Sequence, residues 1–572
     1  MSAVMEAREP SAKYLAPVQQ ALVQQFELLA TAPGGVKRLR ELILTLAVQG
    51  RLVTQNPCDE PASDLVRRIR ADKARLISSG TLRPDKPYAA ITDAEQPFNL
   101  PPGWTFVRFG DASINRDGER IPVASSERDG RAKIYDYYGA SGVIDKIDGY
   151  LFEKTLLLIG EDGANLLNRS TPIAFLAHGK FWVNNHAHVI DTTEPGLMRY
   201  LELFVNAISL EPYVTGTAQP KMNQAKRNGI VIALPPLAEQ ARIVARVEEL
   251  MRLCDALEAQ GQLEAAQHAQ LVRTLLGTLT DSANADELAA NWQRVATHFD
   301  TLLDRPEAID ALEQTILQLA VRGLLVPQDP NEEPASALLQ KILAEKDRLI
   351  AEGKLKREDS LPTISDEEKP FELRSGWDWV RLADLMPKFQ NGASSRGDAG
   401  GKSVTVLRLA DIKSRRISLA ETRQVPIKHS DIEKYQLEEG DILITRVNGS
   451  ADIVGQFNLC DRPVTAIYCD HFIRMRIDRR WITPEFCALL GESELVRKRI
   501  SSLFITTAGQ KTVNQGHIGS LLFALPPISE QSRIVARVEE LRRLCADLRQ
   551  RLAASQIAQS HLAETLVEST TA

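Results

Sequence analysis

The sequence predicts a mixed α/β (α+β) fold in which two globular α/β domains are joined by two long helices, arranged as an internal repeat. Its 572 residues are enough for roughly four domains. Two blocks of helical character each occur twice along the chain. The segments between these blocks contain short strand-like runs bounded by glycine and proline. Together these three observations favour a duplicated protein over a single compact core.

Self-comparison defines the repeat. Residues 39–104 align without a gap with 312–377, at an offset of 273, and 32 of 66 positions are identical. Residues 234–257 align with 525–548, at an offset of 291, and 18 of 24 positions are identical. The intervening segments share little except at their C-terminal ends. The chain therefore divides into a helical segment 1–104, an α/β segment 105–233, a long helix 234–280, a helical segment 281–377 that repeats the first block, an α/β segment 378–524 and a long helix 525–572.

The first repeated block predicts a helix that begins at Ser63, which can cap a helix N-terminus, and ends at Gly80. Ser336 and Gly353 repeat this pattern in the second copy. Short strands are predicted in the α/β segments and at their ends. They are 156–159, 230–234, 441–445 and 521–525.

Each repeated Pro-Pro pair opens a long helix, because proline suits the first helical position and Glu239 or Glu530 in the first turn favours the helix dipole. Spacings of four and three residues then place one apolar stripe along each helix. The stripes are Ile243, Val247, Leu250, Cys254 and Leu257, and Ile534, Val538, Leu541, Cys545, Leu548 and Leu552. We expect the two stripes to pair, with packing of each stripe on its own domain as the alternative. About 40–45 helical residues would extend roughly 65 Å, which is the length of a spacer.

Composition excludes several classes of protein. Hydrophobic residues at 44% and charged residues at 25% argue against a disordered or fibrous chain. No apolar run reaches the ~18–20 residues that cross a bilayer, and no secretory signal is visible, so we expect a cytoplasmic protein with six reduced cysteines and no membrane partner. A net charge of −6 excludes a uniformly basic polyanion binder, so any nucleic-acid surface must be local. Segment 378–524 carries 21 basic against 17 acidic residues, and segment 105–233 carries 14 against 15.

Catalytic and metal-binding signatures are missing. Residues 397–403 resemble a phosphate-binding loop, but Arg396 stands where the motif requires glycine. His186 and His188 have no further ligand at metal spacing, and we expect them on or beside a strand as packing or polar contacts. A second weak metal candidate combines two cysteines and a histidine, namely Cys460, Cys469 and His471. We therefore predict no catalytic residue, no metal site and no cofactor bound by this chain.

Polar loops supply the candidate DNA contacts of the second α/β segment. Arg446, Asn448 and Ser450 follow a strand, and arginine and asparagine can bond bidentately to guanine and adenine, respectively. An exposed turn without a ligand is the alternative. Five basic residues are candidate phosphate contacts, with solvated charge as the alternative: Arg396, Lys402, Lys413, Arg415 and Arg416. Gln510 and Lys511 complete this set near the end of the segment.

The first α/β segment provides a weaker set of candidate contacts. They are Lys133, Tyr138, Ser141, Asn165, Asn168, Arg169, Gln219 and Lys221. Asn223 aligns with Asn514 at the offset of 291, and we expect these two asparagines to hold the shape of a loop.

The whole layout resembles the DNA-specificity subunit of type I restriction-modification systems. The resemblance rests on Leu234–Gln240 (LPPLAEQ) and Leu525–Gln531 (LPPISEQ), each of which opens a long helix. Further matches are Tyr137–Gly142 (YYGASG), Ile159–Gly163 (IGEDG) and Gly440–Arg446 (GDILITR). Any one of these motifs is weak, but the duplicated helix start after two unlike α/β segments is specific.

The resemblance implies a division of labour. The α/β segments would be target-recognition domains that each read one half of a split site in double-stranded DNA, and the two long helices would pair antiparallel as a coiled coil. The subunit would have no catalytic centre. Two modification (methyltransferase) subunits would use S-adenosylmethionine, and restriction subunits would use ATP and Mg²⁺. The competing hypotheses are a single-chain DNA modification enzyme or nuclease with an unrecognised active site, and a coiled-coil adaptor that binds proteins.

Overall fold

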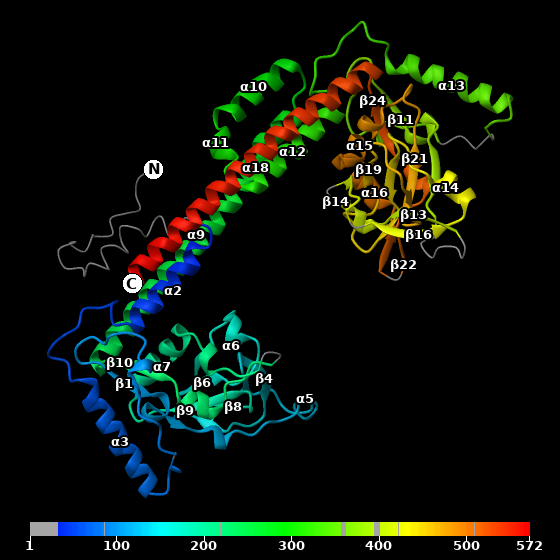
Figure 1. The fold of residues 1–572 in the computed structure, drawn as a ribbon. Helices are drawn as coiled ribbons and strands as arrows, with labels where there is room; N and C mark the ends of the chain where they lie inside the picture. Colours follow the sequence, from blue (N-terminus) through cyan, green and yellow to red (C-terminus); the bar gives the residue numbers. More distant parts are fainter. Residues whose placement is uncertain are drawn as a thin grey trace. The chain divides into compact units, whose positions relative to one another are not determined.

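The computed structural model describes residues 32–571 apart from 85, 217–218, 356–361, 394–400, 414, 421 and 508. The described residues form two compact units, the first within residues 32–264 and 555–571 and the second within residues 265–554. Each unit contains helices and a sheet-rich domain, which confirms the mixed α/β fold (Figure 1). Among the described residues, no helix combines the length and the apolar character needed to cross a membrane.

The first unit holds short helices around two four-stranded sheets. Its helices are α2 (Gly35–Val48), α3 (Ala62–Ser78), α4 (Phe109–Ala112), α5 (Ser125–Arg128), α6 (Asn165–Asn168), α7 (Pro195–Ala207) and α8 (Gln224–Asn228). Its strands are β1 (Thr105–Arg108), β2 (Ile114–Asn115), β3 (Tyr135–Gly139), β4 (Gly142–Ile147), β5 (Phe152–Glu153), β6 (Leu156–Gly160), β7 (Ala174–Ala177), β8 (Lys180–Val183), β9 (Ala187–Asp191) and β10 (Val231–Leu234). The sheet orders are β2-β9-β6-β7 and β4-β3-β8-β5, with β1 and β10 as a separate pair.

The second unit repeats this plan with different sheets. Its helices are α10 (Ala285–Thr297), α11 (Phe299–Leu302), α12 (Pro306–Val321), α13 (Ala335–Ala351), α14 (His429–Tyr435), α15 (Pro484–Glu492), α16 (Glu494–Ser502) and α17 (Gln515–Gly519). The strands are β11 (Asp378–Arg381), β12 (Lys388–Asn391), β13 (Lys402–Leu407), β14 (Ile412–Lys413), β15 (Arg416–Ile417), β16 (Arg423–Ile427), β17 (Ile442–Thr445), β18 (Val447–Asn448), β19 (Phe457–Leu459), β20 (Ile467–Tyr468), β21 (Phe472–Arg476), β22 (Ile505–Thr507), β23 (Gln510–Thr512) and β24 (Leu522–Leu525). The larger sheets have the orders β12-β21-β17-β19, β16-β13-β20 and β18-β23-β22.

Two helices of 44 residues, α9 (Leu237–Thr280) and α18 (Ile528–Thr571), have the predicted length. In the first unit, the early part of α9 buries Ile243, Val247 and Cys254 in the same core as α2, and Ala563 from the end of α18 joins that core. The second unit mirrors this arrangement, with Ile534, Val538 and Cys545 of α18 in one core with α12 and with Val272 of α9. Within each unit, the apolar stripe therefore packs on a helix of its own copy and the end of the other long helix. The expected pairing of stripe with stripe is wrong for these buried residues, because the two sets lie in separate cores, and the alternative, packing of each stripe within its own copy, is confirmed.

The predicted cap at Ser63 is wrong. Helix α3 begins at Ala62 after Pro61, and the Ser63 side chain makes no capping bond. The N–H of Ala62 instead donates to the carbonyl oxygen of Gly103 at 2.8 Å, so a distant loop satisfies the helix start. The second copy does the same, because α13 begins at Ala335, whose N–H donates to Gly376 at 2.8 Å.

A buried tryptophan and glutamate join each domain to its long helix. The Nε1–H of Trp104 donates to Glu239 of α9 at 3.1 Å, and the Nε1–H of Trp377 donates to Glu530 of α18 at 3.0 Å. Burial raises the pKa of both carboxyl groups. These junctions explain why Gly-Trp and Glu-Gln recur in both copies, since each motif supplies one partner of the same hydrogen bond.

Candidate nucleic-acid interface

In the first domain, three segments that are far apart in sequence meet at the end of β6. The N–H of Glu161 donates to the carbonyl of His186 at 2.8 Å, and the Glu161 carbonyl accepts from Met222 at 2.8 Å. Antiparallel bridges join Lys221 to both Asp162 and Thr215, and we use the word hairpin for Thr215 together with residues 219–222. We call the strand end, the histidine turn and the hairpin the three-segment frame.

The second domain has the same three-segment frame at the end of β17. The N–H of Arg446 donates to the carbonyl of His471 at 2.8 Å, and the Arg446 carbonyl accepts from Val513 at 3.0 Å. The hairpin is formed by β22 and β23, with Ile505 opposite Thr512. The two sheet-rich domains therefore share one construction although their sequences differ.

The frame of the second domain brings four candidate contacts together. Strand β18 pairs with β23, so Asn448 lies opposite Lys511, and Gln510 precedes Lys511 on the same strand. Arg446 is partly buried and donates to the carbonyl of Asp470 at 3.5 Å. Asn448 also has a structural role, because its side chain accepts from the N–H of Ser450 at 2.8 Å. The strand-end turn and the hairpin thus form one polar surface.

In the first domain, Gln219 and Lys221 are exposed on the hairpin. Lys221 forms an ion pair with Glu161 at 3.2 Å. The two asparagines that follow the hairpins hold loop shape, as predicted. Asn223 caps α8 by accepting from Lys226 at 3.0 Å, and Asn514 caps α17 by accepting from His517 at 2.8 Å.

Several other candidates of the first domain make contacts within the protein. Tyr138 stacks on Phe175 with ring centroids 5.9 Å apart, and burial raises its pKa. Arg169 has a positive φ of 49° and donates to the carbonyls of Val205 and Ile208 at the end of α7. Asn165 and Lys133 also have partners, Thr171 and Asp145. Ser141 and Asn168 are exposed.

The basic candidates of the second domain are dispersed. Lys402, Lys413, Arg416 and Ser450 are exposed, and Arg396 lies outside the described residues. Arg415 pairs with Glu492 of α15 at 2.7 Å. With Arg416 it lines a pocket against α12, α15 and α18, whereas the frame is built on β17, β21 and the hairpin. The structure therefore does not bring Arg415 and Arg416 together with Arg446.

A buried ionic network supports the frame of the first domain. Asp117 accepts from Nδ1 of His188 at 2.7 Å and from Arg227 at 3.0 Å, while Nε2 of His188 bonds the carbonyl of Met222 at 2.8 Å. Burial by itself raises the pKa of Asp117, but the hydrogen bond with His188 and the charge of Arg227 outweigh it and lower the pKa to about 2. The network links β9 to the hairpin end at Met222.

The two weak metal candidates have other contacts. His188 lies in β9 and bonds Asp117, whereas the exposed His186 bonds Asp162 at 2.8 Å, so both make the polar contacts that we predicted. Cys460 donates to the carbonyl of Arg462 and does not join Cys469 and His471.

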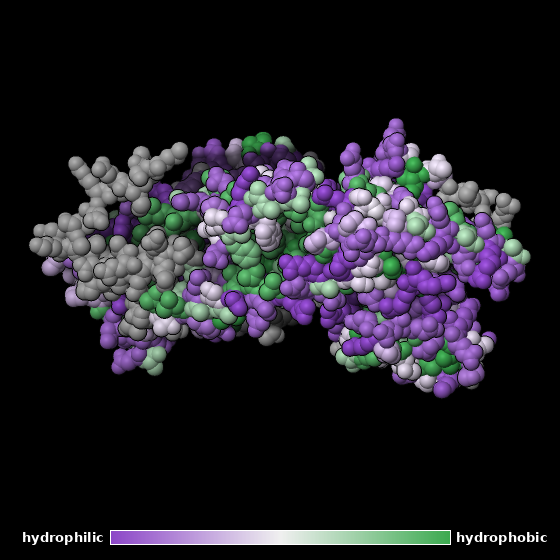
Figure 2. Space-filling view, turned by 90° about the horizontal axis from the view of Figure 1, so that it is seen from above, coloured by the Kyte–Doolittle hydropathy of each residue, from purple (hydrophilic) through white to green (hydrophobic). Residues whose placement is uncertain are grey.

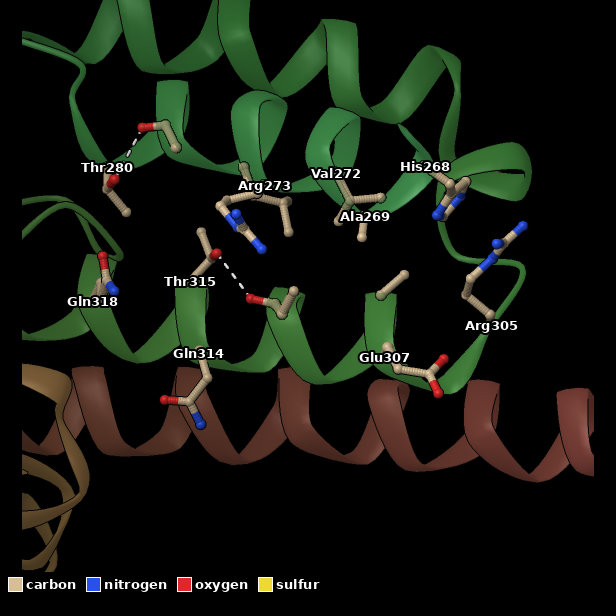
Figure 3. Close-up of a pocket in the computed structure, with 14 residues that line it drawn as sticks. His268, Ala269, Val272, Arg273, Thr280, Arg305, Glu307, Gln314, Thr315 and Gln318 are labelled. Carbon is tan, nitrogen blue, oxygen red and sulfur yellow. Dashed lines mark hydrogen bonds between the residues drawn. The ribbon is translucent and has the colours of Figure 1, made fainter. Parts of the chain in front are cut away.

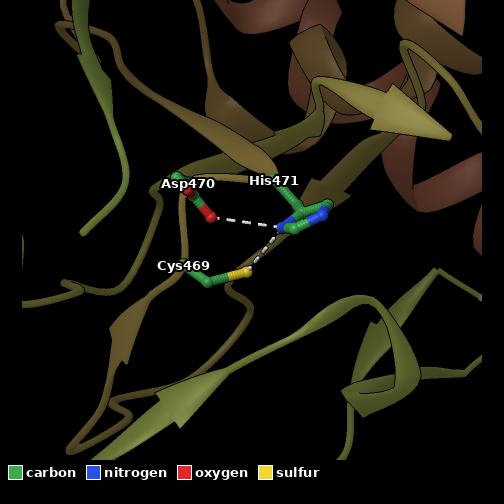
Figure 4. Close-up of side chains that lie close together, drawn as sticks. All are labelled: Cys469, Asp470 and His471. Atoms are coloured by element: carbon green, nitrogen blue, oxygen red, sulfur yellow. Dashed lines mark hydrogen bonds and ion pairs between the residues drawn. The ribbon is translucent and has the colours of Figure 1, made fainter. Parts of the chain in front are cut away.

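In the described part of the chain, the group that approaches metal-ligand spacing is Cys469, Asp470 and His471 (Figure 4). Nδ1 of His471 lies 3.7 Å from Sγ of Cys469 and 3.2 Å from Asp470. Burial raises the pKa of the Cys469 thiol to about 11. The three donors come from consecutive residues, and the absence of a metal site stays a prediction.

A pocket of about 460 Å³ lies between the end of α9 and α12 in the second unit (Figure 3). His268, Arg273 and Arg305 line this pocket, and none of its lining residues is one of the predicted DNA contacts. Ala311 faces this pocket, and Arg38 holds the corresponding position in the first unit, where it donates to the carbonyl of Ser560 at 2.6 Å. The pocket is therefore open in the second copy because alanine stands where the first copy has an arginine.

Hydrophilic residues cover much of the surface seen in Figure 2.

Comparison with known proteins identifies the family of this chain. Residues 101–267 match the model of the type I restriction modification DNA specificity domain. The chain is 35% identical to the specificity subunit of the type I restriction enzyme EcoEI and 36% identical to that of EcoAI, both from Escherichia coli, over 93% of each chain. A solved structure of the HsdS subunit from Thermoanaerobacter tengcongensis is 16% identical, with a TM-score of 0.36 over 84% of this chain and 99% of that chain.

Proposed function

Because the chain belongs to the family of type I restriction enzyme specificity subunits, we propose that it supplies DNA recognition to a restriction-modification complex. The domain within 105–233 reads one half of a split site, and the domain within 378–524 reads the other half. The long helices pair antiparallel and set the distance between the halves. The chain itself has no catalytic centre and binds no cofactor.

The duplicated junction is the observation that carries this proposal. Two domains with different sheets are attached to long helices through the same Trp104–Glu239 and Trp377–Glu530 hydrogen bonds. A constant attachment with variable domains suits a protein in which spacing is fixed and sequence preference differs between the two halves. Loops on a rigid scaffold are the usual place for such recognition.

The three-segment frames are the proposed DNA-facing surfaces. In the second domain, Arg446 lies two residues before Asn448, and Asn448 pairs with Lys511 on the neighbouring strand. The frame thus combines a group suited to guanine with groups suited to adenine and phosphate. In the first domain, Gln219 takes the position of Gln510 at the offset of 291, and Lys221 lies two residues further along, opposite Thr215. Arg415, Tyr138 and Arg169 contribute mainly through their contacts within the protein.

The proposed partners follow from this role. The helical segments 1–104 and 281–377 and the long helices dock two methyltransferase subunits, which use S-adenosylmethionine. Restriction subunits use ATP and Mg²⁺. Double-stranded DNA is the ligand of the complex, and its phosphates contribute a salt-dependent part of the affinity.

Sequencing of methylated DNA from cells that carry the complex tests the proposal. Replacing 378–524 with the corresponding domain of a relative should change one half of the methylated motif and leave the other half and the spacing unchanged. The double variant Arg446→Ala and Asn448→Ala should relax only that same half. A change in both halves, or in neither, would contradict the assignment of one half to each domain.

A single-chain modification enzyme is the competing hypothesis. The purified chain, incubated alone with labelled S-adenosylmethionine and DNA, should transfer no methyl group, and methylation should appear only when methyltransferase subunits are added. Robust transfer by the isolated chain would overturn the proposed division of labour. A sequence- and salt-dependent gel shift by the assembled complex would exclude a purely protein-binding adaptor.

A further inference from the structure

One exposed histidine holds the same position in both domains. Strand pairing places Ile159 opposite His188 in the first domain, and Ile444 opposite Ile473 in the second. Counting back two residues from His188 and Ile473 makes His186 the counterpart of His471. Both accept the equivalent frame bond through their carbonyl oxygens, from Glu161 and Arg446 respectively. The correspondence therefore rests on register and on hydrogen bonding.

The two imidazole rings have similar surroundings. Nδ1 of His186 lies 2.8 Å from Asp162, and Nδ1 of His471 lies 3.2 Å from Asp470. The side chains are 52% and 45% exposed, respectively. A carboxylate thus faces Nδ1 in each domain, and Nε2 is the ring nitrogen on the far side from it. When the ring carries hydrogens on both nitrogens, Nε2–H is a donor for an anionic oxygen.

The residue bonded to this histidine differs sharply between the domains. Glu161 is buried and pairs with Arg120 at 2.8 Å and with Lys221 at 3.2 Å. Arg446 takes the same position in the second domain with the opposite charge. This frame position therefore differs between the two domains in both residue type and charge. A histidine that stays the same in two otherwise different domains suits a contact that is independent of sequence.

We propose that His186 and His471 are corresponding contacts to the DNA backbone, in which each ring donates an N–H to a phosphate oxygen beside its three-segment frame. This inference rests on the proposed function, and it names the atoms that position the duplex in each half-site. A shared metal-binding role does not fit, because the counterparts of Cys469 and Asp470 in the first domain are Asn184 and Asn185.

The test uses the full chain in complex with its methyltransferase subunits. The variants are His186→Ala and His471→Ala, and the matched controls are His178→Ala and His429→Ala. His178 is exposed after β7 at the opposite end of the same sheet, and His429 is exposed at the start of α14. Affinity is measured by gel shift for a duplex carrying the methylated motif and for an unrelated duplex.

Loss of one such hydrogen bond should lower the affinity for DNA by roughly three- to tenfold. We expect His186→Ala and His471→Ala to weaken binding to both duplexes by that factor and to leave the methylated motif unchanged. The controls should stay within about twofold of the wild type. Glutamine, whose amide N–H can donate, should restore part of the affinity at either position.

Two results would overturn the inference. The first is wild-type affinity in both alanine variants, and the second is a methylated motif altered in one half, which would make the histidine a base contact. Failure of the wild-type complex to prefer the motif-bearing duplex is a different outcome, because it would refute the proposed function itself. Thermal unfolding of each variant checks that the domains remain folded.

Discussion

Arg40 and Glu313 occupy corresponding positions in the two copies, and each forms an ion pair across to the long helix of its own copy. Arg40 of α2 pairs with Asp255 at 2.6 Å and Glu258 at 2.9 Å on α9. In the second unit the charges are reversed, since Arg549 of α18 lies 2.7 Å from Glu313 and also 2.6 Å from Asp310 of α12. Glu258 and Arg549 themselves correspond at the offset of 291.

The charge reversal distinguishes helices whose apolar faces are alike. The buried residues of α2 and α12 include the matching pairs Leu39 with Leu312 and Leu46 with Leu319. Apolar packing is non-directional and discriminates weakly between such faces. Exchanging partners would place Arg40 against Arg549, and Glu313 against Glu258. The ion pairs therefore favour the pairing that the structure contains.

Substitution of Arg549 by glutamate should destabilise the second unit. The change places three carboxylates together, and exposed ion pairs contribute up to about 1 kcal/mol each, so we expect a loss of about 1–2 kcal/mol. The combined variant Asp310→Lys and Arg549→Glu should recover part of the loss, because it leaves Glu313 paired with Arg542 at 3.3 Å. Thermal unfolding with hydrogen exchange in α12 measures the effect. Arg543→Glu, on the exposed side of α18, is the matched control, and equal stability of both single variants would contradict the prediction.

Glutamine at positions 239 and 530 should be tolerated at neutral pH. Burial raises the pKa of both glutamates above the ordinary value of 4.5, so the stability they contribute is fully present below that pH. It is lost as pH rises through the higher folded-state pKa. At pH 7 the glutamine variants should equal or exceed the wild type in unfolding free energy, and this advantage should shrink towards pH 4.

Alanine at the same positions should behave differently. It leaves the Nε1–H of Trp104 or Trp377 buried without this acceptor, which costs about 1–3 kcal/mol. Chemical unfolding at several pH values compares the two substitutions. A glutamine variant as unstable as the alanine variant at pH 7 would contradict the assigned role of the carboxyl group.

Alanine at Gly50 should cost more than alanine at Gly80, although both glycines have positive φ, 71° and 75°. A Cβ at Gly50 would lie 2.5 Å from Cγ of Pro101 and 2.8 Å from Cζ2 of Trp104, whereas Gly80 faces open space. Both variants carry backbone strain of about 1–2 kcal/mol, and overpacking adds about 1–3 kcal/mol only at Gly50. Denaturant midpoints measure the difference. Gly323 and Gly353 provide the same comparison in the second unit.

Asparagine at Asp117 should remove a pH-dependent part of the stability of the first domain. The folded-state pKa of Asp117 is about 2 against an ordinary value of 3.8, so its contribution is present above pH 4 and is lost as pH falls towards 2. We expect a loss of about 2 kcal/mol at neutral pH that diminishes between pH 4 and pH 2. Asp136→Asn, at an exposed ion pair with Lys146, is the control and should change stability by less than about 0.5 kcal/mol. A pH-independent loss for Asp117→Asn would contradict the prediction.

The sequence alone determined the duplication, the two long helices, the main strands and the role of Asn223 and Asn514 in holding loop shape. These features depend on residues that are close together along the chain: an apolar stripe at helical spacing, a strand bounded by turns, or a side chain three residues from the N–H it accepts from. Only the tertiary structure decided which segments meet. Gly103, and not Ser63, supplies the bond at the start of α3, and Glu161, His186 and Met222 converge only because β6, β9 and the hairpin become neighbours. Such contacts join residues far apart in sequence, so local patterns carry no record of them, and it is chain topology and backbone hydrogen bonding that select them.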